Sequence, residues 1–180
     1  MDEFAADIRQ FNTARDLEKH LAQYDRDVAN WVTGATLHHT WRPLASQWRG
    51  RRSIVAMINY FVNHHGWDRG PHLFIAPDGI WQMTPLNIPG IHAVTTNKCH
   101  WGIEVVGDYD KLGWPTATKE MVYGTVLALF AWRGITVNER NLVGHRETGS
   151  PKTCPGTAIN MNQVRNELKQ RQSTLCLSMG

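Results

Sequence analysis

An almost uninterrupted apolar run near the middle of the chain constrains the fold more than any other feature. Residues 101–107 contain a single charged side chain, Glu104, among Trp, Ile, Val and Gly. A strand with apolar residues at successive positions is buried on both faces, as in a sheet that has a layer on each side. The run therefore predicts a central, largely buried strand.

The segments around this strand alternate between helix and strand patterns. Apolar residues at helical spacing predict helices at residues 4–30 (one or two helices), 52–65, 117–133 and 161–170. Strand patterns occur at residues 31–40, at 142–145, and at 72–75 and 80–83, which flank a Pro-Asp-Gly turn and predict a hairpin. Gly66 is placed to end the second helix as a C-cap.

This mixture predicts an α/β fold with a central mixed β-sheet flanked by helices on both faces. A chain of 180 residues that is 42% hydrophobic suits one globular domain. We expect an N-terminal helical segment at residues 1–30 packed on the domain, a main domain at 31–172, and a poorly ordered tail at 173–180. We see no repeat, linker or second domain.

Charge and composition exclude several classes of function. The formal net charge is +3 and the basic clusters are short, which does not predict nucleic-acid binding. The first twelve residues have no apolar signal region and no run reaches 18 apolar residues, so we expect synthesis in the cytoplasm without a signal peptide and no membrane insertion. Three cysteines do not form a disulfide framework, and pairing of Cys99 with Cys176 stays open.

Histidine and cysteine residues give a possible metal site. His145 and Cys154 lie nine residues apart on either side of a Gly/Pro-rich loop that can fold back on itself. A catalytic zinc site takes three protein ligands, so a third must come from a distant segment, and His38 or His39 is the natural candidate. Adjacent strand residues point to opposite faces, so one of the two is a ligand, and periodicity does not choose between them.

Four ordered segments carry a resemblance to a known family. They are Leu37-His38-His39-Thr40, then Pro71 to Ile75 with Asp78-Gly79, then Gly90 to Ala93 with Asn97 and Gly102 to Gly107, and finally Gly144-His145-Arg146 with Lys152 to Gly156. Together they resemble the zinc amidases of the N-acetylmuramoyl-L-alanine amidase type over about residues 35–160. That family also includes phage endolysins, bacterial muropeptide-recycling amidases and animal peptidoglycan recognition proteins.

The resemblance implies hydrolysis of the amide bond between the lactyl group of N-acetylmuramic acid and L-alanine in peptidoglycan. It assigns three ligands to one Zn²⁺ per chain, two catalytic residues and three substrate-binding residues. The ligands are His38, His145 and Cys154; the catalytic residues are Glu104 as general base and Lys152 beside the oxyanion; the substrate-binding residues are His92, Asn97 and Arg146.

One position departs from the pattern of many relatives. They carry a Tyr just before the hairpin His, where this chain has Pro71; other members use a Glu on the central strand, which here is Glu104. We expect a monomer that acts on peptidoglycan or muropeptides, as a phage or prophage endolysin that reaches the cell wall after release. The alternatives are a cytoplasmic muropeptide-recycling amidase and a non-catalytic peptidoglycan-binding module. Trp41, Trp67 and Trp81 either stack on sugar rings or fill the core.

Overall fold

A six-stranded mixed sheet forms the centre of the fold, as expected. The computed structural model describes residues 8–178, without the side chains of 176–178. The strands are β1 (Arg9–Phe11), β2 (Gly34–His39), β3 (Leu73–Ala76), β4 (Gly79–Gln82), β5 (His100–Val105) and β6 (Leu142–Gly144). Their order is β1-β4-β3-β5-β2-β6, with β3, β5, β2 and β6 parallel to one another and β4 and β1 antiparallel to their neighbours. The predicted central strand is therefore β5.

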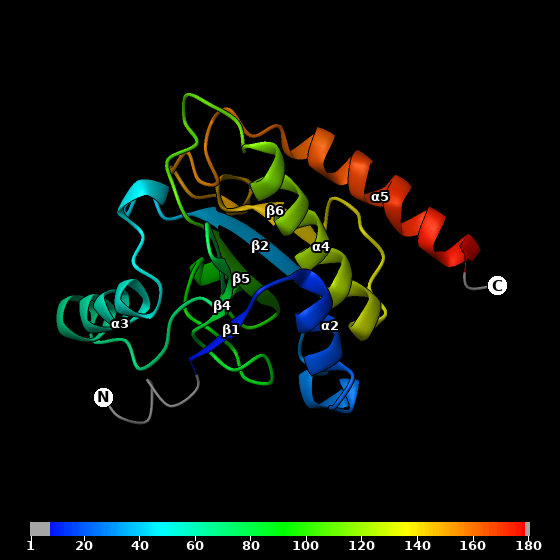
Figure 1. The fold of residues 1–180 in the computed structure, drawn as a ribbon, viewed down its shortest axis with the longest axis horizontal. Helices are drawn as coiled ribbons and strands as arrows, with labels where there is room; N and C mark the ends of the chain where they lie inside the picture. Colours follow the sequence, from blue (N-terminus) through cyan, green and yellow to red (C-terminus); the bar gives the residue numbers. More distant parts are fainter. Residues whose placement is uncertain (1–7, 179–180) are drawn as a thin grey trace.

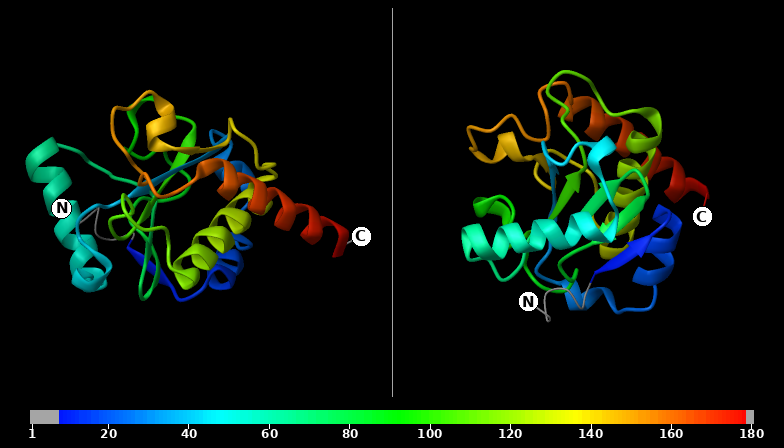
Figure 2. Two further views of the ribbon diagram at one scale, coloured as in Figure 1. Left: turned by 90° about the horizontal axis from the view of Figure 1, so that it is seen from above. Right: turned by 60° about the vertical axis from the view of Figure 1, so that its left-hand side comes forward.

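Helices cover both faces of this sheet (Figures 1 and 2). The four α-helices are α2 (Ala14–Leu21), α3 (Arg51–His65), α4 (Thr116–Arg133) and α5 (Met161–Ser178), and short 3₁₀ turns lie at Arg26–Ala29, Ala45–Gln47, Val94–Thr96 and His145–Thr148. One face packs with α2, α4 and α5 into the larger core, and α3 packs on the other face against a smaller apolar cluster. Gly66 ends α3 in the left-handed conformation (φ 65°), as the sequence predicts.

Alternation along the two middle strands separates core residues from site residues. Leu37 on β2 and Ile103 on β5 point into the larger core, so their neighbours His38 and Glu104 point to the α3 face. The apolar cluster beneath α3 includes Phe74 and Trp81 from β3 and β4. The α3 face of β2 and β5 is therefore the part of the sheet where polar side chains gather.

The N-terminal segment differs from the expected helices. Residues 9–11 form β1, which pairs antiparallel with β4, and the helix begins only after Thr13, whose hydroxyl and backbone form a capping box with Asp16. Phe11 contributes to the core from the strand, so its apolar side chain does not require a helix. The expected helical segment at residues 1–7 lies outside the described part of the chain.

The C-terminal helix is longer than the sequence predicts. Helix α5 continues to Ser178, so the expected boundary at 172 falls inside it. Two contacts fix the helix immediately before this extension: Arg171 forms an ion pair with Glu120 on α4, and the Gln172 side chain hydrogen-bonds the backbone of Val137 and Ile135. The expected disordered tail is therefore helical as far as 178, and residues 179–180 lie outside the described chain.

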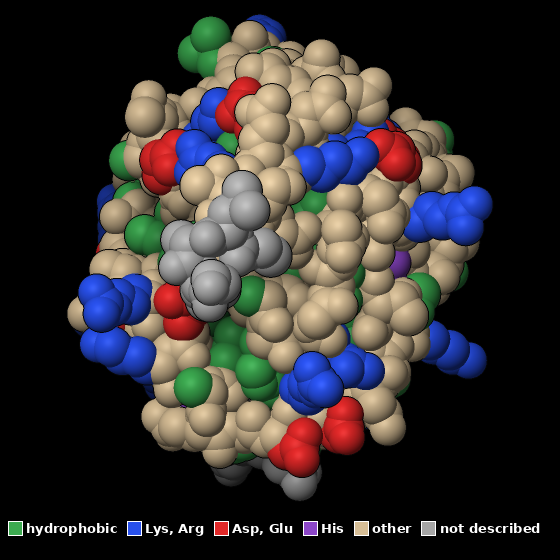
Figure 3. All heavy atoms as spheres, turned by 90° about the vertical axis from the view of Figure 1, so that its right-hand side faces the viewer, with side chains coloured by type: hydrophobic (Ala, Val, Ile, Leu, Met, Phe, Trp, Pro, Cys, Tyr) green, Lys and Arg blue, Asp and Glu red, His purple; other side chains and the backbone are tan. Residues whose placement is uncertain are grey.

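The surface and the helices show two further properties of the described residues. Figure 3 shows Lys and Arg side chains in small groups with Asp and Glu between them, so on this face the small positive charge is not gathered into one patch. None of the described helices combines the length and apolar character that a membrane span requires.

Glycine at the start of β2 gives a test of this packing. A Cβ on Gly34 would clash with the backbone of Asn141, including its Cα at 2.7 Å. We expect Gly34→Ala to lower the free energy of unfolding by about 1–3 kcal/mol, because β2 cannot keep its pairing with the segment before β6. Gly113→Ala is the control, since a Cβ there meets nothing within 4 Å. Equal urea midpoints for both variants would contradict this packing.

Candidate metal centre and active site

Register between β2 and β5 brings the first two site residues together. His38 lies directly opposite Glu104 in the parallel pairing, and both point to the α3 face. His38 Nδ1 lies 3.9 Å from Glu104 Oε1. A carboxylate and an imidazole from segments 66 positions apart in sequence are thus fixed side by side by the sheet itself.

A loop after β6 completes a three-residue group. His145 follows β6 directly, and Cys154 lies at the far end of the loop, where its Sγ is 3.6 Å from His38 Nδ1. Potential ligand atoms of His38, His145 and Cys154 all lie within 4.8 Å of one another, and all three residues are buried. The structure therefore brings together the three residues predicted as metal ligands.

The choice between the two adjacent histidines now follows from geometry. His39 is not part of this group: its Nδ1 accepts a hydrogen bond from the backbone N–H of Tyr109 at 3.1 Å, and its ring lies beside Asp108 and Asp110. Its own N–H donates to Cys154 Sγ at 3.2 Å. His39 thus supports the thiol through its backbone, and His38 supplies the imidazole.

Burial favours the uncharged forms of the three candidate metal-ligating groups. The pKa of His38 lies well below its usual value, chiefly because the ring is desolvated and then because His92 and His145 are near. Burial also lowers the pKa of His145 and raises that of the Cys154 thiol. Neutral imidazoles offer the lone pairs that a metal requires, and a cation at this point would favour loss of the thiol proton.

Glu104 is the unusual acid of the site. Burial raises its pKa to about 8, partly offset by the positive charge of Lys152. Its Oε2 is buried and has no hydrogen-bond partner among the described residues. A buried carboxyl oxygen without a partner costs free energy, so its presence points to a ligand or reacting group at this position.

Above this group lies a cleft of about 620 Å³. Its lining includes all four residues just described, together with Lys152, His92 and Pro71. The other wall comes largely from α3 and the segment after it, with Tyr60, Phe61, His65 and Trp67. Trp41 lines the rim and is 56% exposed, whereas Trp81 is buried under α3 and belongs to the core.

Two of the expected substrate-binding residues have internal partners. The Arg146 guanidinium donates to the carbonyl oxygens of Thr153, Gly156 and Ile159, so it holds the loop that carries Cys154. Asn97 Oδ1 accepts the backbone N–H groups of His92 and Ala93, both at 2.9 Å. Through these hydrogen bonds Arg146 and Asn97 support the protein's own loops, and their expected substrate contacts stay a prediction.

His92, the third expected substrate-binding residue, lines the cleft and also contacts a metal-ligating residue. Its Nδ1 lies 3.1 Å from His38 Nε2. Burial is the main cause that lowers its pKa to about 3, so the ring is neutral.

Sequence reasoning missed the residues that hold the His145 turn. Arg165 on α5 is 4% exposed and forms an ion pair with Glu147, with N–O distances of 2.8 and 3.0 Å. Glu147 also accepts the backbone N–H of Gly144, immediately before His145. Most residues next to Arg165 in the sequence are polar, so no sequence pattern indicates that this arginine is buried.

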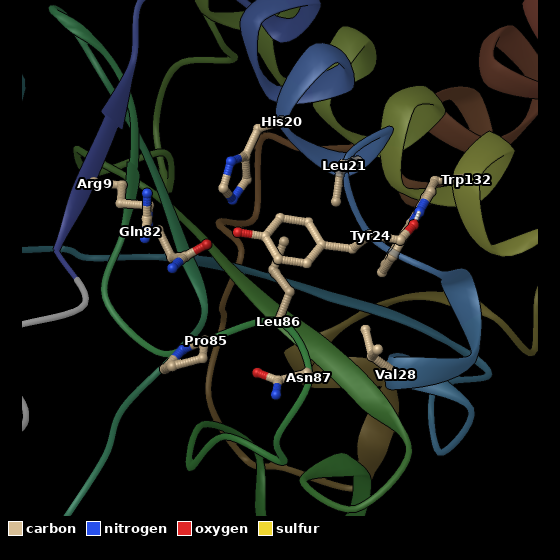
Figure 4. Close-up of a pocket in the computed structure, with 10 residues that line it drawn as sticks. All are labelled: Arg9, His20, Leu21, Tyr24, Val28, Gln82, Pro85, Leu86, Asn87 and Trp132. Carbon is tan, nitrogen blue, oxygen red and sulfur yellow. Dashed lines mark hydrogen bonds between the residues drawn. The ribbon is translucent and has the colours of Figure 1, made fainter.

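A second, smaller hollow lies by α2 and α4, away from the metal-ligating group (Figure 4). It measures about 200 Å³, and its lining includes Tyr24, Leu86 and Trp132. His20 stands beside Tyr24 in it, and ring contacts at 5.1 Å join His20 to both Phe11 and Tyr24. His20 is thus a packed aromatic residue, consistent with the absence of a predicted role.

Comparison with known proteins identifies the family of this α/β domain. Residues 28–157 match the sequence profile of the family described as N-acetylmuramoyl-L-alanine amidase. This match covers most of the chain, and the protein belongs to that family. No curated protein sequence matches it closely enough to serve as a relative.

Solved structures of the same fold include enzymes and recognition proteins. The endolysin N-acetylmuramoyl-L-alanine amidase LysCS from Clostridium intestinale is 20% identical, with a TM-score of 0.62 over 77% of this chain and 84% of that chain. Drosophila PGRP-LB is 24% identical, with a TM-score of 0.57 over 69% and 75%. Peptidoglycan recognition protein-LE, solved with tracheal cytotoxin, is 20% identical, with a TM-score of 0.62 over 73% and 78%. At these identities the similarity shows the fold.

The hydrogen bonds of Arg146 predict an effect on the stability of the loop that carries Cys154. Arg146→Ala should lower the free energy of unfolding by about 1.5–3 kcal/mol, because carbonyl groups of the ligand loop lose a charged donor. Amide hydrogen exchange should rise in residues 147–156. Arg42→Ala is the control, since that guanidinium bonds only the neighbouring carbonyl of Trp41 among its described hydrogen bonds. Unchanged exchange in the loop would show that Arg146 does not hold it.

Proposed function

We propose that this protein is a zinc-dependent amidase that hydrolyses the bond between the lactyl group of N-acetylmuramic acid and L-alanine in peptidoglycan. The observation that carries the proposal is the convergence of His38, His145 and Cys154 beside Glu104 in one cleft. Membership of the amidase family supports amide hydrolysis as the reaction. Peptidoglycan or its muropeptide fragments would be the substrate.

The residues present fit one zinc ion. Two neutral imidazoles and a thiolate are donors that zinc prefers, and three protein ligands leave a position open for chemistry. The orphaned Oε2 of Glu104 lies beside this group. Zinc bound there would supply a Lewis acid that polarises the amide carbonyl and lowers the pKa of water.

Glu104 and Lys152 supply the proton transfer and charge stabilisation. Glu104 would take a proton from the attacking water as its oxygen forms a bond to the carbonyl carbon, and would deliver that proton to the nitrogen as the C–N bond breaks. Lys152 lines the cleft, and its ammonium group would offset the negative charge that develops on the carbonyl oxygen. The products are the lactyl carboxylate and a free amino group on L-alanine.

Pro71 lines the same cleft and has no hydroxyl group that could handle a proton. The position that many relatives fill with Tyr is therefore chemically inert here. Glu104 is then the carboxyl group within reach of the ligand group. Burial raises its pKa to about 8, and a zinc ion bound beside it would lower that pKa, so that the carboxylate could act as the general base.

A phage or prophage endolysin is the biological role that we favour, with synthesis in the cytoplasm, a monomeric chain and action on the cell wall after release. The endolysin among the structural relatives supports this role. Recognition proteins of the same fold support a second candidate, binding of peptidoglycan without hydrolysis. The thiol of Cys154 in the ligand group favours the enzyme, because zinc-activated hydrolysis needs a complete ligand set.

Trp41 would contribute a sugar contact at the rim of the cleft. It is a non-glycine residue with positive φ (55°), and its indole is largely exposed. Backbone strain of this kind in a bulky residue is found where a side chain must be held in place for function. A flat exposed indole suits stacking on the apolar face of a sugar ring.

The decisive experiment measures new amino termini released from purified peptidoglycan, identified by mass spectrometry. Wild-type protein loaded with zinc should release peptides that begin with L-alanine. Glu104→Gln should bind about one zinc equivalent and lose most activity, at least about a hundredfold, because general base catalysis contributes on this scale.

A chelated wild-type sample is the second arm, and zinc added back should restore its activity. Cys154→Ser should lower both zinc content and activity, which separates loss of the metal from loss of the base. Retention of peptidoglycan in a pull-down without any new L-alanine amine would overturn the amidase and leave a binding module.

Two substitutions at Trp41 separate backbone strain from sugar contact. Trp41→Ala and Trp41→Gly should both lower kcat/KM on muropeptides, since each removes the indole. Trp41→Gly should be the more stable variant by about 1 kcal/mol, because glycine adopts positive φ without a steric cost. Neither substitution should change kcat/KM for hydrolysis of an N-lactyl peptide that lacks the sugar.

Leu112→Ala is the matched control, because Leu112 is 76% exposed and does not line the cleft. Equal losses on substrates with and without the sugar would show that Trp41 does not contact the glycan.

A further inference from the structure

His92 lies between the backbone of β5 and the imidazole of His38. Its Nε2 is 3.1 Å from the carbonyl oxygen of His100, and its Nδ1 is 3.1 Å from His38 Nε2. The two rings meet edge to face, with centroids 5.2 Å apart. A carbonyl oxygen, two imidazoles and the metal-ligating group thus form one continuous row.

The carbonyl oxygen of His100 determines which atom donates in each hydrogen bond of this row. The His100 oxygen can only accept, so His92 Nε2 carries a proton. A neutral imidazole has one N–H, so His92 Nδ1 is an acceptor and His38 Nε2 must be the donor. His38 Nδ1 is then an acceptor, with Cys154 Sγ as its hydrogen-bond partner at 3.6 Å and Glu104 Oε1 at 3.9 Å.

We infer that His92 is a positioning residue that holds His38 in the Nε2–H tautomer and directs its Nδ1 lone pair at the metal. The inference deepens the proposed function and rests on it for the identity of the metal. Hydrogen bonds of this kind behind a ligand fix its tautomer and orientation and increase metal affinity. Here a second histidine and a backbone carbonyl take the place of the carboxylate often found there.

The surroundings of His92 hold its ring in the required place. Asn97 Oδ1 accepts the N–H groups of His92 and Ala93 and so fixes the backbone turn that carries the ring. On the other side the ring packs on Gly102, where a Cβ would lie 2.7 Å from the ring Cδ2. A side chain at residue 102 of β5 would displace the ring, so glycine there keeps the row intact.

His72 offers a matched comparison within the same protein. It is completely buried, its Nε2 bonds the carbonyl oxygen of Ile88 at 3.0 Å, and its Nδ1 accepts the N–H of Gly102 at 2.9 Å. It is thus a neutral Nε2–H histidine beside His92, with centroids 6.1 Å apart, and none of its hydrogen bonds goes to the ligand group. Replacement of His72 therefore tests whether a general loosening of the site changes metal affinity, while the hydrogen bonds that join His100, His92 and His38 remain.

The first test uses the metal-free wild-type protein, labelled with ¹⁵N in histidine. Long-range ¹H–¹⁵N spectra distinguish a protonated ring nitrogen from an unprotonated one. We expect both His38 and His92 to show a protonated Nε2 and an unprotonated Nδ1 at neutral pH. A protonated Nδ1 on His38 in this spectrum would overturn the inference without any reference to zinc or to activity.

The second test measures zinc affinity by competition with a chelator. His92→Phe keeps a ring in place and removes the acceptor, so the zinc dissociation constant should rise roughly 10–100-fold. His92→Gln, whose carbonyl oxygen can accept from His38 Nε2, should recover part of this loss. His72→Phe should stay within about twofold of wild type, since it leaves the row unchanged.

A His92→Phe affinity within about twofold of wild type, or an equal loss in His72→Phe, would overturn the positioning role. The same histidine spectra show whether each variant is folded, because the signals of the remaining imidazoles should stay dispersed. If wild-type protein bound no zinc at all, the proposed function would fall, while the tautomer measurement would still decide the arrangement of His38 and His92.

Discussion

The parallel pairing of β2 with β5 is the constraint on which the site depends. It sets His38 opposite Glu104, while Leu37 and Ile103 point into the core. Because side chains alternate with a period of two, a shift of one residue would exchange these faces and bury the imidazole among apolar side chains. The same hydrogen bonds that build the sheet therefore hold the proposed metal ligand and the proposed base at a fixed separation, more precisely than loops would.

The loop that carries Cys154 must be ordered against its conformational entropy, and two arginines contribute to this. Arg146 bonds three carbonyl groups of the segment around Cys154, and Arg165 reaches from α5 to Glu147 beside His145. Guanidinium groups suit this purpose because their several N–H donors lie in a rigid plane. The C-terminal helix thus belongs functionally to the site, although it contributes no residue to the cleft.

The sequence predicts the strands, the two long middle helices and the ligand group because each depends on local patterns or on ordered motifs. It misses β1, because three residues such as Arg9–Phe11 carry too few alternations to outweigh a nearby helical pattern. It also predicts substrate contacts for Asn97 and Arg146, whose partners are backbone groups of their own loops. Motif position shows that a polar side chain lies near a site, but hydrogen-bond partners decide whether it faces the substrate or supports the loop.

The free-energy cost of burying Glu104 bears on both candidate functions. A buried carboxyl oxygen without a partner destabilises the fold by at least about 1–3 kcal/mol, and an apolar side chain in its place would remove that cost. A bound peptide amide could supply the missing partner of Oε2 in a protein that only binds peptidoglycan. In the proposed hydrolysis the attacking water would be that partner, and the acid would in addition transfer its proton. This second use of the carboxyl group is why we favour the enzyme.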